Sequence, residues 1–347
     1  MNDLSLPAGT VARADGGVPH PWLVADIGGT NARFGWVSDA GTRVEHVRTL
    51  SCADHQGPAE AMQAYLAALR AERGDHFHPP RAAAWAVATA VADDHVMLTN
   101  SGWSFSRQAV RSQLGLHTLR VLNDFEALAL ALPHLQPAQR RPIGPTPEPM
   151  AGGTLAVVGP GTGLGVAAVV PVAGQWVAVP GEGGHATLAA ADDHESAVLA
   201  AARREFAHVS AERLLSGIGL PVLHRAAAAV DGAVVDDLTA ELIVERGLGG
   251  IDTACGRTLD LFCALLGSFA GNVALTTGAR GGVFIGGGIV PRLGQRFFDS
   301  RFRERFEAKG RFQPYLQAIP TWLITDTLVA LTGAKAALEL MSPRCGD

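Results

Sequence analysis

The chain has 347 residues, enough for two domains of about 150 residues each, and its 28 Lys and Arg against 33 Asp and Glu leave a net charge of −5. A mildly acidic chain without basic blocks argues against a nucleic-acid-binding protein. The four cysteines form no C-x-x-C pair, which argues against a zinc knuckle or a disulfide framework and favours a reducing cytoplasm. Lys309 and Lys335 both follow Ala, so neither fits the phosphate loop G-x-x-x-x-G-K-[ST] of a P-loop nucleotidase.

Residues 1–21 are predicted to form a flexible tail. They lack the cationic start and the apolar stretch of a secretory signal, so they are not expected to be one. No apolar run approaches the roughly 18 residues of a membrane span, so no membrane association is expected. The remaining chain, with 48% hydrophobic residues overall and 41 glycines, is typical of a compact α/β enzyme with many tight turns.

The first half of the chain opens with a predicted β-hairpin. Two apolar runs, 22–27 and 32–37, flank Gly28-Gly29-Thr30-Asn31. Strands are then predicted at 44–50, 82–91, 96–98 and 119–122, and helices at 57–73, 103–114 and 125–132. The segment 136–153 contains five prolines and is predicted to connect two domains.

The second half begins with the same arrangement. Strands predicted at 154–158 and 164–170 flank the Gly-rich turn 159–163. Helices are predicted at 193–208, 211–216, 236–246 and 251–276, then a strand at 282–285, a helix from about 291, a strand at 321–324 and a helix at 328–341. The repeat predicts a duplicated α/β fold with a cleft between its halves, in which ligands bind at the carboxyl ends of strands. The expected domains are 22–134, completed by the C-terminal helix 326–343, and 135–325.

The two Gly-rich hairpins are candidate phosphate sites. Free backbone N–H groups and the Thr30 hydroxyl suit an anion, and Asp26 could hold Mg²⁺ directly or through water. The alternative is an ordinary hairpin turn. In the second hairpin, Leu164 and Val166 stand where the dinucleotide fingerprint G-x-G-x-x-G needs glycine, so a Rossmann site is disfavoured and a second phosphate hairpin is preferred.

Other polar residues suggest a site for a small polar substrate. Asp124, at the end of a buried strand, is placed to accept a proton from a substrate hydroxyl, or else to cap the following helix. Glu182 and His185 lie among glycines and offer the acceptors and donors that a sugar needs, whereas Glu212 could simply be a first-turn carboxylate that a helix dipole favours. The glycines of 286–288 lie between a strand and a helix, where a nucleoside could pass closely.

Together and in this order, these motifs resemble the bacterial glucokinase family of the proteobacterial type, within the actin/hexokinase/Hsp70-like superfamily. The resemblance covers about residues 22–340. The segments on which it rests are Asp26–Arg33, Leu122–Phe125, Gly161–Gly165, Pro180–His185, Val209–Gly217 and Gly282–Arg292. The repressor/ORF/kinase branch carries a cysteine-rich zinc motif, but this chain has no cysteine between Cys52 and Cys255.

The resemblance implies a two-domain actin-like ATPase (ribonuclease-H-like) fold with a duplicated mixed-sheet core and an interdomain cleft. It implies ATP-dependent phosphorylation of D-glucose at the 6-hydroxyl with Mg²⁺, the reaction by which glucose enters glycolysis. It also implies that the protein is a cytoplasmic homodimer. The family's catalytic base matches Asp124. The sugar contacts match Asn123, Asp124, Glu182, His185, Glu212, Gly161 and Thr162. The nucleotide contacts match Ala25, Asp26, Ile27, Gly28, Gly29, Thr30, Gly163, Gly286, Gly287 and Gly288.

Two other functions stay open from the sequence. One is a kinase of another hexose, such as mannose or an N-acetylhexosamine, with the same catalytic parts. The other is a non-catalytic sugar-sensing regulator, against which the acidic charge and the short N-terminal segment count.

Overall fold

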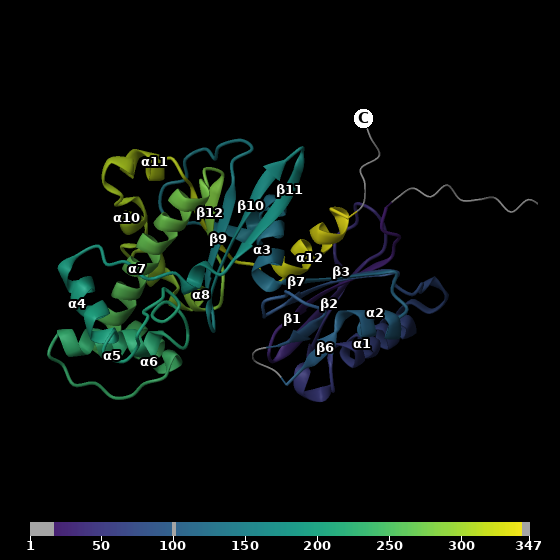
Figure 1. The fold of residues 1–347 in the computed structure, drawn as a ribbon, viewed down its shortest axis with the longest axis horizontal. Coiled ribbons are helices and arrows are strands. Elements are labelled where there is room, and N and C mark those ends of the chain that lie inside the picture. The colour runs from purple at the N-terminus through teal and green to yellow at the C-terminus, as the bar shows by residue number, and fades with distance from the viewer. Residues whose placement is uncertain (1–16, 99–101, 342–347) are drawn as a thin grey trace, which may run out of the picture.

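Two mixed β-sheets, each followed by its own helices, make up the protein in the computed structural model, which describes residues 17–98 and 102–341 (Figure 1). Most of the predicted N-terminal tail, residues 1–16, lies outside the described residues. Two helices, α3 (Asp124–Ala131) and α12 (Val329–Glu339), lie side by side between the sheets.

The first sheet has the strand order β3-β2-β1-β4-β7, with β1, β2 and β3 antiparallel and β1, β4 and β7 parallel. Its strands are β1 (Trp22–Ile27), β2 (Asn31–Val37), β3 (Glu45–Ser51), β4 (Ala82–Val87) and β7 (Thr118–Asn123). A small separate pair, β5 (His95–Met97) and β6 (Ser104–Ser106), lies beside it, with helices α1 (Pro58–Arg73) and α2 (Arg107–Gln113).

The second sheet repeats this order as β11-β10-β9-β12-β13 and adds β8 antiparallel at its edge. Its strands are β8 (Arg140–Pro142), β9 (Leu155–Pro160), β10 (Leu164–Val172), β11 (Gln175–Gly181), β12 (Gly282–Ile285) and β13 (Thr321–Ile324). In both sheets an antiparallel three-stranded meander is followed by two parallel strands. The duplication predicted from the two hairpins is therefore confirmed.

Helices cover the outer face of the second sheet. They are α4 (Asp193–Ala202), α5 (Leu220–Val230), α6 (Ala240–Leu248), α7 (Thr253–Thr277), α8 (Ile289–Leu293), α9 (Gln295–Phe298), α10 (Phe302–Glu307) and α11 (Gln313–Gln317). Buried apolar side chains form a core on the outer face of each sheet and a third core between the sheets, around α3 and α12. Apolar burial on both faces explains the near-continuous hydrophobic runs of the parallel strands.

The contact between α3 and α12 needs a glycine. A Cβ at Gly333 of α12 would lie 1.7 Å from the carbonyl oxygen of Ala127 on α3. The two helices therefore pack with their backbones in close approach, and α12 also packs on β1 and β4. This contact fastens the C-terminal helix to the first sheet, from which it is distant in sequence.

Several local predictions were wrong. Residues 211–216 form turns, because the N–H groups of Ala211 and Glu212 donate to the carbonyls of Ala186 and Gly184 rather than within a helix. The strand predicted at 82–91 ends at Val87, and the helix predicted at 193–208 ends at Ala202. The predicted helix 103–114 is a strand followed by α2, which Ser106 caps. The sequence interpretation missed β8, β11, α5, α9 and α11. The run 301–305, which overlaps α10, is predicted from the sequence to be a solvated helix face.

The expectation that no apolar run is long enough for a membrane span was also wrong. Helix α7 has 25 residues and is apolar enough to cross a membrane by length and composition alone. However, 78% of its most apolar window is buried inside the protein, as in the core helix of a globular domain. The stripe that includes Leu259, Phe262 and Phe269 lies in that core.

The basic run 301–305 is not a fully solvated helix face. Arg303 and Arg305 of α10 are buried. Arg305 pairs with Glu195 and Asp192 at the start of α4, and Arg303 with Glu307 in its own helix. Carboxylates from another element thus compensate charges that would be costly to bury alone.

Candidate functional site

Three parallel strands of the first sheet end together. The β1–β4 and β4–β7 registers align Ile27, Val87 and Asn123 at the carboxyl edge. Asp26 lies one residue before this level and Asp124 one residue after it. The sheet therefore brings to one edge two carboxylates that are almost a hundred residues apart in sequence, as expected for parallel strands.

Asn123 rather than Asp124 caps the helix that follows β7. Its Oδ1 accepts from the N–H groups of Phe125 and Glu126 at 2.9 and 3.4 Å, and its Nδ2 donates to the Thr89 carbonyl. Asp124 is the first residue of α3, and its carboxylate accepts the Phe125 N–H at 3.0 Å. The helix therefore does not need Asp124 as its cap, and this carboxylate is left for another role.

Burial and, to a smaller extent, the nearby Asp26 charge together raise the pKa of Asp124 to about 6, against the hydrogen bond from Phe125. Burial also raises the pKa of Asp26, although Arg33 opposes this shift through an ion pair of 3.0 Å. Arg33 is the cross-strand partner of Asp26 in the β1–β2 hairpin. A carboxylate with a pKa near neutrality at a strand end is suited to exchange a proton with a bound hydroxyl.

The first hairpin, residues 26–31, turns tightly beside these carboxylates. The Gly28 N–H donates to the Asn31 carbonyl at 2.9 Å, so it is occupied within the turn. Within the described chain, neither Gly28 nor Gly29 is among the residues with positive φ. Ala25 and Ile27 are buried and Thr30 is exposed at the tip. The hairpin offers an exposed polar tip on a buried base.

The second hairpin, residues 159–165, lies against the start of α3. Gly159 and Gly165 are cross-strand partners, and a Cβ on either would come within 2.4 Å or 2.0 Å of the Phe125 ring. These two glycines therefore make room for an aromatic ring rather than for a phosphate. Because Phe125 follows Asp124 directly, this contact places the Asp124 backbone beside the second hairpin.

Three other candidate side chains gather in two loops. We call residues 181–188 the Glu182 loop and residues 209–217 the Glu212 loop. His185 Nε2 lies 4.0 Å from a carboxylate oxygen of Glu182 and 3.9 Å from one of Glu212. The side chains of Glu182 and His185 are 69% and 60% exposed and that of Glu212 is 23% exposed, so two of the three are open to a ligand from solution.

Backbone hydrogen bonds join the two loops. Glu212 N–H donates to the Gly184 carbonyl and Ala211 N–H to the Ala186 carbonyl, both at 2.8 Å. The Glu212 loop also contacts the second hairpin, since Gly217 N–H donates to the Gly161 carbonyl at 2.7 Å. Nothing in the sequence indicated these hydrogen bonds between the loops. They stand where a helix was predicted, and they bring Glu182, His185 and Glu212 close to one another.

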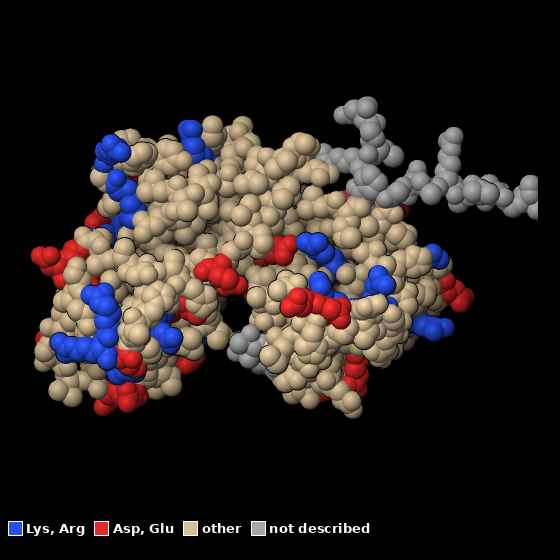
Figure 2. All heavy atoms as spheres, viewed as in Figure 1, with Lys and Arg blue, Asp and Glu red and all other residues tan. Residues whose placement is uncertain are grey.

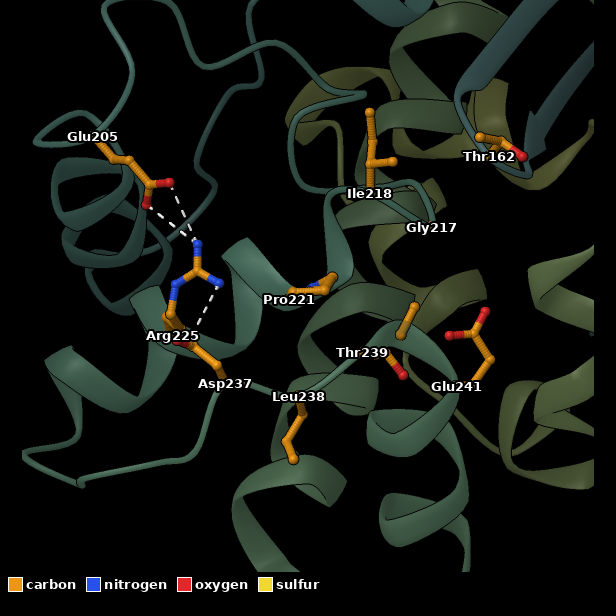
Figure 3. Close-up of a pocket in the computed structure, with 11 residues that line it drawn as sticks. Thr162, Glu205, Gly217, Ile218, Pro221, Arg225, Asp237, Leu238, Thr239 and Glu241 are labelled. Atoms are coloured by element: carbon orange, nitrogen blue, oxygen red, sulfur yellow. Dashed lines mark hydrogen bonds and ion pairs between the residues drawn. The ribbon is translucent and has the colours of Figure 1, made fainter. Parts of the chain in front are cut away.

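Two adjoining pockets extend from the second hairpin. A pocket of about 550 Å³ lies between Thr162 of the second hairpin, α6 and the start of α8, where Gly288 and Arg292 line it. A wider hollow of about 980 Å³ shares Thr162, Gly217 and Glu241 with it. Figure 3 shows Thr162 and Ile218 on one side of this hollow, and Arg225, bridged to Glu205 and Asp237, on the other.

The turn 286–288 lies at the inner end of the smaller pocket. A Cβ at Gly287, whose φ is +77°, would lie 2.3 Å from the Pro160 carbonyl oxygen, so this turn packs on the second hairpin and needs a glycine. Gly288 has no atom close to its missing Cβ and lines the pocket. Sequence reasoning found this turn but missed the pocket residues Ile218, Leu220, Ala240, Glu241, Val244, Glu245, Ile289 and Arg292.

A ready-made metal centre is not evident. Among residues 17–98 and 102–341, no group of three or more His, Cys, Asp or Glu could hold a metal ion. A magnesium ion in such a site would depend on one or two carboxylates together with substrate phosphates and water, which is its usual mode beside nucleotides. Asp26, next to the first hairpin, fits that mode.

Comparison with known proteins gives one consistent family. The sequence model of the glucokinase family matches residues 23–341. A glucokinase of Chromobacterium violaceum is 49% identical over 332 residues, which cover 94% of this chain and 93% of that protein. A protein of Paraburkholderia xenovorans named bifunctional protein glk is 46% identical, over 97% of this chain and 51% of that protein.

Solved structures agree in fold. A glucokinase crystal structure from an Antarctic psychrotroph superposes with a TM-score of 0.83 at 40% identity, covering 92% of this chain and 99% of that one. A glucokinase of Balamuthia mandrillaris in complex with glucose gives a TM-score of 0.70 at 16% identity, over 92% of this chain and 93% of that one, and so shows the fold alone.

Proposed function

The chain belongs to the glucokinase family, and from this membership we propose which of its residues carry out each part of the reaction. It phosphorylates glucose with ATP on an actin-like ATPase fold. The observation that supports the assignment of the residues is the raised pKa of Asp124 at the strand ends, beside both hairpins.

Asp124 is the general base. Its carboxylate would accept the proton of the glucose 6-hydroxyl while that oxygen attacks the γ-phosphoryl group. A pKa of about 6 keeps the group ionised at neutral pH and still able to hold a proton. Phosphoryl transfer depends mainly on positioning and charge neutralisation, so this base also orients the hydroxyl in line.

Glucose binds between Asp124 on one side and the Glu182 and Glu212 loops on the other. Asn123, Glu182, His185 and Glu212 are the proposed partners of its hydroxyl groups, with Gly161 and Thr162 beside them. The exposed carboxylate of Glu182 and the imidazole of His185 have free acceptor and donor positions for this purpose. The 69% exposure of the Glu182 side chain would fall when the sugar and the opposite half cover it.

ATP binds along the two hairpins. Residues 25–30 and Gly163 would face its phosphates, and the turn 286–288 its nucleoside, for which the adjoining pocket of about 550 Å³ has a suitable size. Mg²⁺, bound to ATP and held by Asp26 through water, would neutralise charge on the phosphates. Asp26 remains half of an ion pair with Arg33, which keeps its carboxylate oriented.

Residues 22–134 with the C-terminal helix form one proposed domain and residues 135–325 the other. The packing of α12 on β1 and β4 supports this division. The space-filling view is hollowed between the two halves, consistent with an interdomain cleft (Figure 2). Closure of this cleft around glucose would exclude water as a competing acceptor.

The proposed setting is the first step of glycolysis in the cytoplasm, carried out by a homodimer that binds neither nucleic acid nor membrane. Membership of the family supports this setting, as does the mildly acidic charge of −5.

A coupled assay of glucose 6-phosphate formation tests the assignment. The wild-type protein with Mg–ATP should turn over glucose with a higher kcat/KM than mannose or N-acetylglucosamine. Asp124→Asn should keep its glucose affinity and lose about 10²–10⁴-fold in kcat, the usual contribution of a general base. A folded variant with near-normal kcat would show that Asp124 is not the base.

A further inference from the structure

One carboxylate of the Glu212 loop reaches into the second hairpin. Glu212 Oε2 accepts the Leu164 N–H at 2.8 Å, directly after the hairpin tip. A Cβ at Gly163 would lie only 2.5 Å from the same oxygen, so the glycine permits this close approach. The side chain is 23% exposed and therefore largely shielded from water.

The other groups of Glu212 face the sugar side. Oε1 lies 3.9 Å from His185 Nε2, and the Glu212 N–H donates to the Gly184 carbonyl at 2.8 Å. Glu212 thus contacts the Glu182 loop through its backbone and the second hairpin through its side chain. Gly217, farther along the Glu212 loop, supports the hairpin from its carbonyl side through Gly161.

From these contacts we propose that Glu212 is a positioning residue for the ATP phosphates as well as a sugar contact. Because its carboxylate accepts the Leu164 N–H, Glu212 fixes the tip of the second hairpin relative to the Glu182 loop. The ATP site and the glucose site therefore keep the same position relative to each other. The inference rests on the proposed function of the two loops. A residue that served the sugar alone would leave nucleotide binding unchanged when no sugar is present.

Binding of Mg–AMPPNP to the full chain without sugar is the decisive measurement, by isothermal titration calorimetry. Glu212→Ala removes the acceptor of Leu164 N–H, and we expect the Kd to rise roughly 3- to 30-fold, because part of the value of a hydrogen bond to a charged group would be lost from nucleotide binding. Glu212→Gln keeps an oxygen that can accept the same N–H. It should bind Mg–AMPPNP nearly as the wild type does while its KM for glucose rises.

Glu182→Gln is the matched control, because Glu182 faces His185, whereas the carboxylate that accepts the hairpin's Leu164 N–H is that of Glu212. It should raise the KM for glucose and leave the Kd of Mg–AMPPNP unchanged. Gly163→Ala tests the same contact from the hairpin, because the added Cβ would displace Oε2 of Glu212. It should weaken nucleotide binding in the wild-type background and add little in the Glu212→Ala background.

An unchanged Kd in folded Glu212→Ala overturns the proposal, as does a Gly163→Ala effect that is fully additive with it. If Glu212→Ala does not fold, the comparison of Gly163→Ala with the wild type decides: an unchanged Kd there overturns the proposal. Failure of the proposed residue roles gives a different result, because glucose turnover by the wild type and Asp124→Asn is measured separately from nucleotide binding.

Discussion

Asp124 should set the acid limit of activity. Its pKa of about 6 means that kcat/KM for glucose falls about tenfold per pH unit below pH 6, as the base becomes protonated in the free enzyme. Asp26→Asn removes a nearby negative charge, so the pKa of Asp124 and the midpoint of the profile should move to lower pH. Steady-state kinetics from pH 4.5 to 8 measure this shift.

Glu126→Gln is a suitable control for that profile. Glu126 is on the same helix, but it pairs with Arg120 at 3.1 Å and does not contribute to the shift of Asp124. Its acid midpoint should equal that of the wild type. An Asp26→Asn midpoint that stays in place or rises would contradict the electrostatic explanation.

Burial of the Asp124 carboxylate should lower the free energy of unfolding of the wild-type protein at neutral pH. Because the pKa of Asp124 is raised in the folded protein, folding favours its protonated form, and this contribution is lost as the pH rises from about 4 to about 6. Asp124→Asn should therefore unfold with a free energy ~1–3 kcal/mol above that of the wild type at pH 7.5, and with no difference near pH 3.5. Urea denaturation at both pH values measures the gap, and a gap independent of pH would refute the burial argument.

At the scale of elements, the start of α3 is held by the second hairpin. The Phe125 ring occupies the space over Gly159 and Gly165, at the point where β9 and β10 pair. Gly165→Ala would place a methyl group 2.0 Å from ring atoms, and such overpacking should lower the free energy of unfolding by about 1–3 kcal/mol. Guanidinium denaturation of the variant and the wild type measures the loss.

Gly161→Ala is the matched stability control in the same hairpin. Its Cβ would meet no atom within 4 Å, and Gly161 is not among the described residues with positive φ. Its stability should equal or slightly exceed that of the wild type, because alanine reduces the freedom of the unfolded chain. Equal losses in both variants would mean that the hairpin, rather than the Phe125 contact, is sensitive to substitution.

At the scale of the whole molecule, glucose should bring the two halves together. Asp124 directly follows β7 of the first sheet, and the Glu182 and Glu212 loops come after β11 of the second sheet, so a sugar that touches both stabilises the closed form. Solution X-ray scattering should show a smaller radius of gyration with saturating glucose than without ligand. No contraction would count against binding between the halves.

Gly29→Val separates this closure from nucleotide binding. The added branched side chain stands in the first hairpin, away from the two loops that bind the sugar, and should obstruct the phosphates of ATP. Contraction with glucose should persist in this variant, while its KM for ATP should rise. A variant that loses contraction as well would place glucose on the first hairpin.

Much of this protein is determined locally, and the sequence alone was sufficient for it. The hairpins at 26–31 and 159–165, the ends of the strands that carry Asp26 and Asn123, and the long helix α7 follow from short-range patterns, because glycine pairs and apolar spacing act over a few residues. The aromatic and β-branched side chains of Trp176, Val177 and Val179 could also have identified β11 from the sequence.

Tertiary contacts decided the rest. Residues 211–216 look helical, but the N–H groups of Ala211 and Glu212 donate to the Glu182 loop. The buried carboxylate of Glu195 in α4 pairs with Arg305, which is buried with it. Only the fold shows that Gly159 and Gly165 serve Phe125, that Asn123 is the cap, and that Glu212 reaches the second hairpin. Apart from Asn123, which caps residues next to it, the partner is distant in sequence in each case. The sequence pattern shows which local conformation and which partners a residue favours. Tertiary packing then decides which of these the folded protein contains.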